Sequence, residues 1–404
     1  MDKICPNGYN LRIVYQSSSK SKRQAMPLKS LTWPQVNAWR LSQHGLDPRL
    51  KRQDILEAAS RTGGIQAQVM SAAELALGAR VPGLTPQEVQ SALWQERTLV
   101  KTWAMRATLH LISARDLPLY VAARSLYENR NWVGYFEYHG ISREQFEAYL
   151  SAAPAVLGSE PLTREQLAAA VAEHTGIPEL QNLMVSKGWG TPLKPLAWRG
   201  FLCFGPNAGR NVTFVNPRHW LDTWRGLEPY PALQEVARRY LRAYGPATVE
   251  EFALWWGLGL TPARKLFRSL EGELEAVEVA GWPALALRDT LEPMQKSKLP
   301  GSVRLLPLFD AYVMGIGRGP DIEPLLPKEF QRQVYRPQGW ITAVVLMDGY
   351  FKGIWEIKSQ GSQASLKVRL FSPASAALKK GIAAEVDRLS AFLNTQLSLV
   401  YEDQ

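Results

Sequence analysis

Cysteine is nearly absent from this chain: Cys5 and Cys203 are the only two in 404 residues. Two cysteines exclude a disulfide framework and a cysteine-rich metal site. The five histidines lack the short spacing of zinc ligands, and no glycine-rich phosphate loop or nucleophile elbow occurs. The sequence therefore predicts neither a metal nor an organic cofactor.

Long hydrophobic runs are also missing. No stretch reaches the roughly eighteen apolar residues that a membrane span needs. The first 25 residues are basic but have no long apolar core, which argues against a secretory signal. We expect a cytoplasmic, nucleoid-associated bacterial protein, with residues 1–30 as a disordered basic tail and Met26 as an alternative start of translation.

The charge of the chain is basic, with 47 Lys and Arg against 37 Asp and Glu and a net charge of +10. Such a surplus suggests a polyanionic partner, although many enzymes are equally basic. A hydrophobic fraction of 46% is typical of a globular protein, and 404 residues are too many for one core. We therefore expect a monomer of several domains.

An order of helices followed by a short antiparallel ribbon occurs three times before residue 300. In the first copy, helices are expected over 50–62, 71–80 and 85–97, and strands over 99–103 and 108–112. Ser71 and Glu74 fit a capping box, and Pro86 suits the first helical position. This order is that of a winged helix-turn-helix unit.

The second and third copies begin with capping-box sequences at Thr163 and Thr248. The second continues with a helical stretch over 193–198 and strands over 201–204 and 212–215; the third with a helix over 261–270 and strands over 274–279 and 284–287. The three predicted units cover residues 31–150, 151–230 and 231–298.

After residue 300 the sequence is rich in strands. Strands are expected over 340–347, 350–357 and 366–371, with Asp348-Gly349 as a hairpin turn and a final helix over 376–393. The predicted fold class is α+β: three tandem winged helix-turn-helix units followed by a small strand-rich α+β domain over 299–404.

The most informative segment is Gln66-Ala67-Gln68, which follows Gly63-Gly64 and connects two expected helices. In an extended segment, positions i and i+2 point to the same side, so both amides could face one point. A glutamine is not a strong base, but two of them can hold and orient a water. The alternative is a solvated loop or a partner for free helix ends.

Four segments together resemble the AlkZ-like DNA glycosylases, a bacterial family built from tandem winged helices. The segments are Ile65–Gln68, Met105–His110, Leu306–Asp310 and Asp348–Trp355. Ala107 stands where the family usually has glycine, and Gln68 stands where a YcaQ-like branch has an acid. The resemblance covers nearly the whole chain after the basic tail.

The resemblance implies hydrolysis of the N-glycosidic bond of alkylated purines in DNA, cross-linked ones included, with Gln66 and Gln68 as catalytic residues. A base alkylated on a ring nitrogen is already cationic, so it leaves without a general acid. The transition state is oxocarbenium-like. The enzyme must therefore hold a water beneath the sugar carbon and shield the developing positive charge.

Six further residues are candidates for DNA contacts: Lys101, Arg106, Thr108, His110, Arg210 and Asp310. Arg106, in the turn of a ribbon, would bind a phosphate or be solvated. His110 alternates with leucines and so faces away from their core, where a structural role is the alternative. Arg210 lies in the expected turn of a hairpin, and Asp310 would hold a helix end or a catalytic loop.

Two other classes of function stay open: a non-catalytic winged-helix regulator or architectural protein, and a nucleotide or RNA enzyme on the same scaffold. A regulator would carry base-reading side chains on a recognition helix, whereas the glutamine pair lies between helices. The tryptophans of interest are expected to pack rather than to stack on bases. They are Trp189, Trp198, Trp255 and Trp256.

Overall fold

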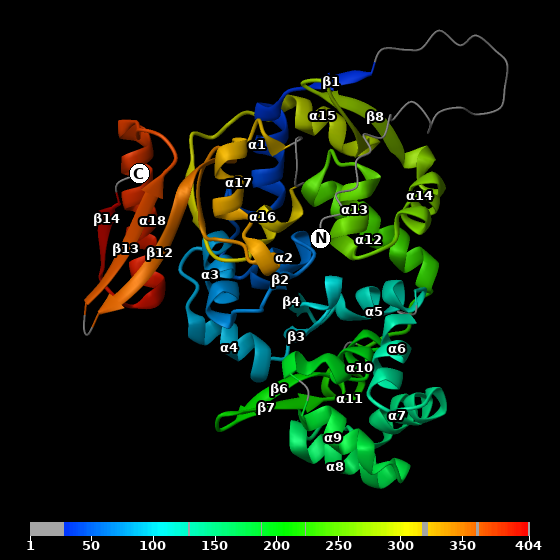
Figure 1. The fold of residues 1–404 in the computed structure, drawn as a ribbon. Coiled ribbons are helices and arrows are strands. Elements are labelled where there is room, and N and C mark those ends of the chain that lie inside the picture. The colour runs from blue at the N-terminus through cyan, green and yellow to red at the C-terminus, as the bar shows by residue number, and fades with distance from the viewer. Residues whose placement is uncertain are drawn as a thin grey trace, which may run out of the picture.

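The computed structural model describes residues 28–127, 130–186, 188–222, 224–316, 322–360 and 363–402 (Figure 1). Most of the predicted basic tail therefore lies outside the described residues. Its last residues were wrongly assigned, because Lys29–Leu31 form strand β1, which pairs in parallel with strand β8 of the third helix–ribbon unit.

The first unit has the expected element order. Its elements are α2 (Ile55–Arg61), β2 (Ile65–Gln66), α3 (Met70–Arg80), α4 (Pro86–Trp94), β3 (Leu99–Trp103), the short turn η2 (Met105–Ala107) and β4 (Leu109–Ser113). The three strands form one sheet in the order β2-β4-β3. The helix start predicted at Thr85-Pro86 is confirmed, and Thr85 forms a capping box with Glu88.

Two local predictions in this unit are wrong. Ser71 does not cap α3, because the helix already begins at Met70 and Ser71 lies inside its first turn. The helix predicted from residue 50 starts at Ile55, because the Asp54 carboxylate accepts from Lys51 N at 3.2 Å and stabilises a turn there instead.

The second unit occupies the lower end of the molecule in Figure 1. Its elements are α7 (Arg143–Val156), β5 (Leu162–Thr163), α8 (Arg164–Thr175), α9 (Pro178–Ser186), η3 (Gly188–Leu193), α10 (Lys194–Trp198), β6 (Cys203–Ala208) and β7 (Asn211–Val215). Its sheet has the order β5-β7-β6, and the predicted capping box at Thr163 is formed. Helices α5 (Leu117–Ser125) and α6 (Arg130–Tyr138) lead into it, and α11 (Pro217–Trp220) leads out.

The third unit repeats the order. It contains α12 (Pro229–Tyr244), α13 (Val249–Trp256), α14 (Leu260–Ser269), η4 (Glu271–Glu273), β8 (Leu274–Val279), β9 (Trp282–Leu287) and α15 (Arg288–Lys296). The predicted capping box at Thr248 is formed. Its sheet has the order β1-β8-β9, and α1 (Trp33–Gln43) contacts α12 and α15. The start of the chain thus packs with the third unit, not with the first as expected.

The C-terminal domain is rich in strands, as predicted. It contains β10 (Val303–Leu306), α16 (Ala311–Gly315), α17 (Lys328–Val334), η6 (Pro337–Gly339), β11 (Val344–Met347), β12 (Tyr350–Gln360), β13 (Gln363–Leu370), α18 (Ala376–Leu393) and β14 (Leu397–Tyr401). The sheet order is β10-β11-β12-β13-β14, and apolar side chains of α18 pack on it. The α+β fold class is confirmed.

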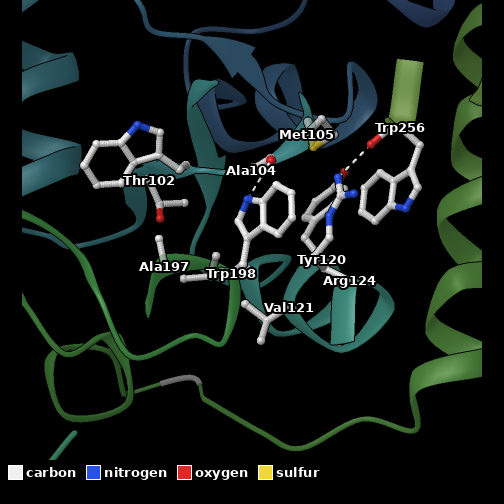
Figure 2. A pocket seen from close by; sticks show the side chains of 11 residues that line it. Thr102, Ala104, Met105, Tyr120, Val121, Arg124, Ala197, Trp198 and Trp256 are labelled. Carbon is white, nitrogen blue, oxygen red and sulfur yellow. Dashed lines mark hydrogen bonds between the residues drawn. The ribbon is translucent and has the colours of Figure 1, made fainter. Parts of the chain in front are cut away.

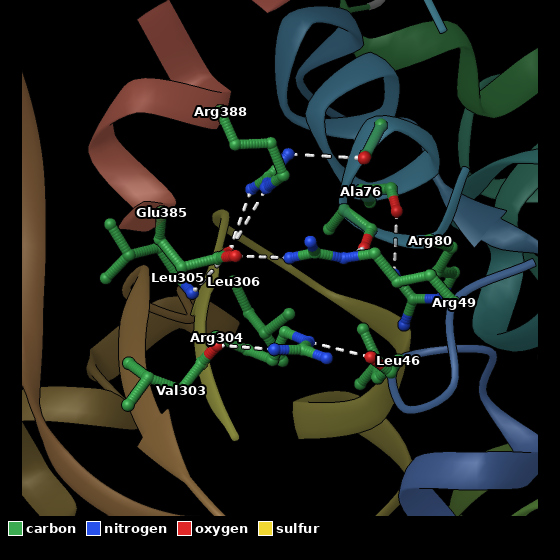
Figure 3. A network of polar contacts seen from close by, with 12 residues as sticks. Leu46, Arg49, Ala76, Arg80, Val303, Arg304, Leu305, Leu306, Glu385 and Arg388 are labelled. Carbon is green, nitrogen blue, oxygen red and sulfur yellow. Dashed lines mark hydrogen bonds and ion pairs between the residues drawn. The ribbon is translucent and has the colours of Figure 1, made fainter. Parts of the chain in front are cut away.

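A buried carboxylate joins this domain to the first unit (Figure 3). Glu385 on α18 pairs with Arg49 and, at 3.2 Å, with Arg388, and it accepts from Leu305 N at 3.2 Å. Arg388 also donates to Gly78 O in α3 at 3.2 Å. Burial opposes ionisation of Glu385, but the arginines outweigh it and lower the pKa of its carboxyl group.

Candidate active site

Gln66, His110 and Thr102 form a row across one face of the sheet β2-β4-β3. The strand register pairs Gln66 with His110 and His110 with Thr102. Opposed residues on neighbouring strands point to the same face of a sheet. The fold therefore places the first glutamine beside a histidine that lies 44 residues further along the sequence (110 − 66).

Gly63 and Gly64 bring the chain into β2. Both have positive φ angles, of 71° and 105°, which glycine adopts without strain. A Cβ atom on Gly63 would lie 2.8 Å from the ring of Trp255. Glycine at this position therefore allows the sheet edge to approach α13.

Gln66 and Gln68 lie on either side of Ala67 and differ in exposure. Ala67 N donates to Leu109 O at 2.7 Å, which continues the ladder, and its methyl group is buried in the core. Gln66 is 6% exposed, whereas Gln68 is exposed. Strand β2 ends at Gln66 and the chain bends at Gln68, so the extended segment is shorter than the sequence predicted. The action of both glutamines on a single water stays a prediction.

Arg106 orients the Gln66 amide. Its Nη2 donates to Gln66 Oε1 at 3.4 Å, and its Nη1 donates to Trp255 O. Arginine only donates, so the amide oxygen must be the atom that faces Arg106, and the amide nitrogen points elsewhere. The structure thus joins two residues that the sequence presented as separate candidates.

The turn that carries Arg106 is held in a strained backbone conformation. Arg106 and Ala107 have φ angles of 55° and 56°, in the left-handed region that residues with a Cβ rarely adopt. Glycine would relieve this strain at position 107. This backbone conformation sets the direction in which the Arg106 side chain points.

His110 is a neutral hydrogen-bond acceptor in this site. Its ring is 2% exposed, and Nδ1 lies 2.9 Å from Thr108 O. A carbonyl oxygen only accepts, so Nδ1 carries the proton and Nε2 is left as an acceptor. Burial and the neighbouring charge of Arg106 lower the pKa of His110 to about 3, so the ring is neutral at physiological pH.

A small pocket adjoins the same sheet face (Figure 2). Residues that line it include Thr102, Met105, Tyr120, Arg124, Trp198 and Trp256. Arg124, on α5, is the only charged residue among them. No motif in the sequence points to this arginine, because its helix carries none and the pocket is assembled from four segments of the chain: the end of β3 with η2, α5, α10 and α13.

The tryptophans were expected to pack, and two of them do so: Trp255 is 6% exposed and Trp256 is 1% exposed. Trp198 is half-buried at the pocket, where its Nε1 donates to Ala104 O at 3.2 Å. The side chain of Trp189 lies outside the described residues.

Asp310 does not bind DNA in this fold, contrary to the prediction. Its two carboxylate oxygens accept from Arg80 Nη1 and Nη2, both at 2.8 Å, and both side chains are fully buried. It also accepts from Tyr312 N at 2.9 Å as the cap of α16. The alternative reading, a residue that holds a helix end, is the correct one.

The other three candidates lie apart from one another. Lys101 is half-buried, with its ammonium nitrogen 5.1 Å from the centre of the Phe204 ring, and burial lowers its pKa. Thr108 donates to Met105 O at 3.1 Å within the turn. Arg210 is exposed at the turn of the β6–β7 hairpin. Their contacts with DNA stay predictions, and Arg210 is the most accessible.

In the part of the chain that the structure describes, no cluster of three or more His, Cys, Asp or Glu side chains is arranged to hold a metal ion. Over the same residues, no helix has the length and apolar character to cross a membrane.

Comparison with known proteins gives consistent results. The family described as "DNA glycosylase AlkZ-like" matches residues 59–392. The "Interstrand DNA cross-link repair glycosylase" of Streptomyces sahachiroi is 35% identical over 336 residues, which cover 81% of this chain and 89% of that protein. The solved structure of the Streptomyces sahachiroi DNA glycosylase AlkZ superposes with a TM-score of 0.81 at 32% identity, covering 92% of this chain and all of that one.

Proposed function

The chain belongs to the AlkZ-like DNA glycosylase family, and from this premise we propose that it removes alkylated purines, including cross-linked ones, from double-stranded DNA. The enzyme is a DNA glycosylase. The proposal about cross-links draws support from the printed name of the Streptomyces relative. The purine preference follows from the chemistry of a leaving base that is already cationic.

The observation that carries the proposal is the Gln66 amide, which Arg106 orients beside the neutral ring of His110. In our proposal the amide nitrogen of Gln66 donates to a water and Nε2 of His110 accepts from it. Gln68 contacts the same water from the solvent side. Three weakly basic groups suit positioning rather than deprotonation.

The proposed reaction needs no general acid. The bond between C1′ and the base nitrogen breaks, and its electron pair neutralises the cationic base. The held water then adds to the oxocarbenium carbon and loses a proton to solvent. The glutamines do not ionise, so the rate of this step should be nearly independent of pH around neutrality.

We further propose that the three helix–ribbon units are winged helix-turn-helix units that hold duplex DNA. The exposed Arg210 at the β6–β7 hairpin is placed as a wing residue would be. Lys101 and Thr108 are proposed to support the DNA-binding face, and the enzyme is proposed to act as a monomer at the nucleoid of a bacterial cytoplasm.

Release of free base from a duplex containing one N7-alkylated guanine tests the proposal. The purified enzyme should release the alkylated base and leave an abasic site, without cutting the strand. Tight binding of this duplex with no base release would contradict the proposal and favour the non-catalytic alternative.

A further inference from the structure

Arg124 carries a buried positive charge. Its aromatic neighbours account for how its side chain packs, but they do not neutralise this charge. Its side chain is 7% exposed, and no carboxylate pairs with it within the described segments of the chain. Arg80, which is also buried, pairs with Asp310. A buried charge is costly unless it is paired, so a buried arginine that has no carboxylate partner among the described residues and lies beside a reaction site suggests an anion supplied by the ligand.

The guanidinium of Arg124 is held with both faces covered. Its central carbon lies 4.6 Å from the ring centre of Trp198 and 4.2 Å from that of Trp256. Figure 2 shows it between these two rings, with Nη2 donating to Trp256 O at 2.7 Å. In the described structure this is its one hydrogen bond, so its other donors lie along the edge of the group.

This arrangement favours a phosphate over a base. A base would have to stack on the tryptophans, but the guanidinium already covers their facing sides. The donor edge of a guanidinium matches two phosphate oxygens. Burial, and after it the nearby charge of Arg106, lower the pKa of Arg124 to about 9, so Arg124 stays protonated near neutral pH.

We propose that Arg124 binds the DNA backbone phosphate next to the nucleotide whose base is removed. The pocket of Arg124 adjoins the sheet face that carries Gln66 and His110, so a phosphate held there would lie beside the proposed water. This inference rests on the proposed function.

A phosphate in this position would serve the reaction twice. No acidic residue lines the pocket, so a negative charge near the oxocarbenium carbon would come from the substrate itself. A fixed phosphate would also serve as the pivot about which the nucleotide rotates out of the base stack. Arg124 is thus a positioning residue that acts through the DNA backbone.

The test combines a protein variant with a neutral phosphate analogue. Duplexes carry one N7-alkylguanine and, in turn, a methylphosphonate at each phosphate flanking the lesion. Affinity is measured by fluorescence anisotropy on a 2′-fluorinated, uncleavable version, and base release by single-turnover rates on the cleavable one. The proteins are the wild type, Arg124→Gln, Arg124→Lys and, as a control, Arg238→Gln, which alters an exposed ion pair with Glu273.

At one flanking position, the methylphosphonate should weaken wild-type binding about tenfold to a hundredfold, the usual effect of losing a charge-assisted hydrogen bond. Arg124→Gln should cause a similar loss, and the two changes together should cost little more than either alone. The affinity of Arg124→Lys should lie between those of the wild type and Arg124→Gln, because lysine keeps the positive charge but cannot donate two parallel hydrogen bonds to a phosphate. Arg238→Gln should behave as wild type.

Losses that multiply at every flanking position, or an Arg124→Gln variant that binds normally, would overturn the proposal. If thermal melting shows that Arg124→Gln does not fold, Arg124→Lys is compared with the wild type instead. A methylphosphonate that weakens DNA binding by Arg124→Lys as much as it weakens binding by the wild type would then overturn the proposal. If the wild type binds but releases no base, the proposed function fails, while the anisotropy measurements still decide whether Arg124 binds the phosphate.

Discussion

Replacing Gln66 with alanine should slow base release about 100- to 1,000-fold, which corresponds to roughly 3–4 kcal/mol of barrier. The change removes one oriented polar group from the proposed water site. The group acts mainly in the transition state, so the loss should fall on the single-turnover rate and leave DNA affinity nearly unchanged.

The structure also sets the expected cost in stability. Gln66 loses a hydrogen bond of 3.4 Å to Arg106, whose Nη1 still donates to Trp255 O. A hydrogen bond to a charged group is worth about 1.5–3 kcal/mol, which is still less than the roughly 5–15 kcal/mol that holds a domain folded. A urea unfolding curve should therefore show a folded variant.

Gln68 and Gln234 serve as comparisons. Gln68→Ala should slow base release with no loss of stability, because Gln68 is exposed. Gln234, which donates to Ser269 Oγ at 3.0 Å on the third unit, provides a matched substitution whose rate should stay that of the wild type. Near wild-type single-turnover rates in both Gln66→Ala and Gln68→Ala would remove the glutamine pair from the mechanism.

Four further outcomes are expected. Gln68→Asp should be milder than Gln68→Ala in single-turnover assays, because a carboxylate can still hold water and stabilise the cationic sugar. DNA affinity should fall steeply between about 50 and 200 mM salt, and a flat salt response would argue against phosphate contacts. Deletion of residues 1–25 should weaken non-specific DNA binding while base release persists. Asp310→Ala should lower the free energy of unfolding by about 3–5 kcal/mol in urea titrations, because it leaves a buried arginine unpaired; a small loss would contradict that pairing. Folding lowers the pKa of the Glu385 carboxyl group below its ordinary value of 4.5. The ionised carboxylate therefore stabilises the fold fully above pH 4.5, and this stabilisation is lost as pH falls through the folded-state pKa. The melting temperature of Glu385→Gln should accordingly vary less with acid pH than that of the wild type.

Signals confined to a few neighbouring residues could be read from the sequence. The capping-box sequences at Thr163 and Thr248 mark two helix starts correctly, because each depends on contacts three residues apart. The same logic fails at Ser71, because α3 already begins at Met70 and Ser71 lies inside its first turn.

Contacts between distant segments could not be predicted in this way. The resemblance to the family drew attention to Gln66, Arg106 and His110, but only the register of β2 on β4 and the turn at η2 bring them together. Arg124 carries no sequence signal, since its pocket requires α5, α10 and α13 to meet. Asp310 looked like a site residue because nothing in its own segment reveals Arg80 as its partner.

The pairing of β1 with β8 has a consequence for biosynthesis. The ribosome makes Lys29–Leu31 first, but their partner Val277–Val279 emerges about 250 residues later. The first and second sheets can close soon after residues 113 and 215 leave the exit tunnel, whereas β1 and α1 must wait beside them with apolar side chains uncovered. The segment from β1 to α1 is therefore among the last to fold, and until then its uncovered apolar side chains are ones that a chaperone would bind.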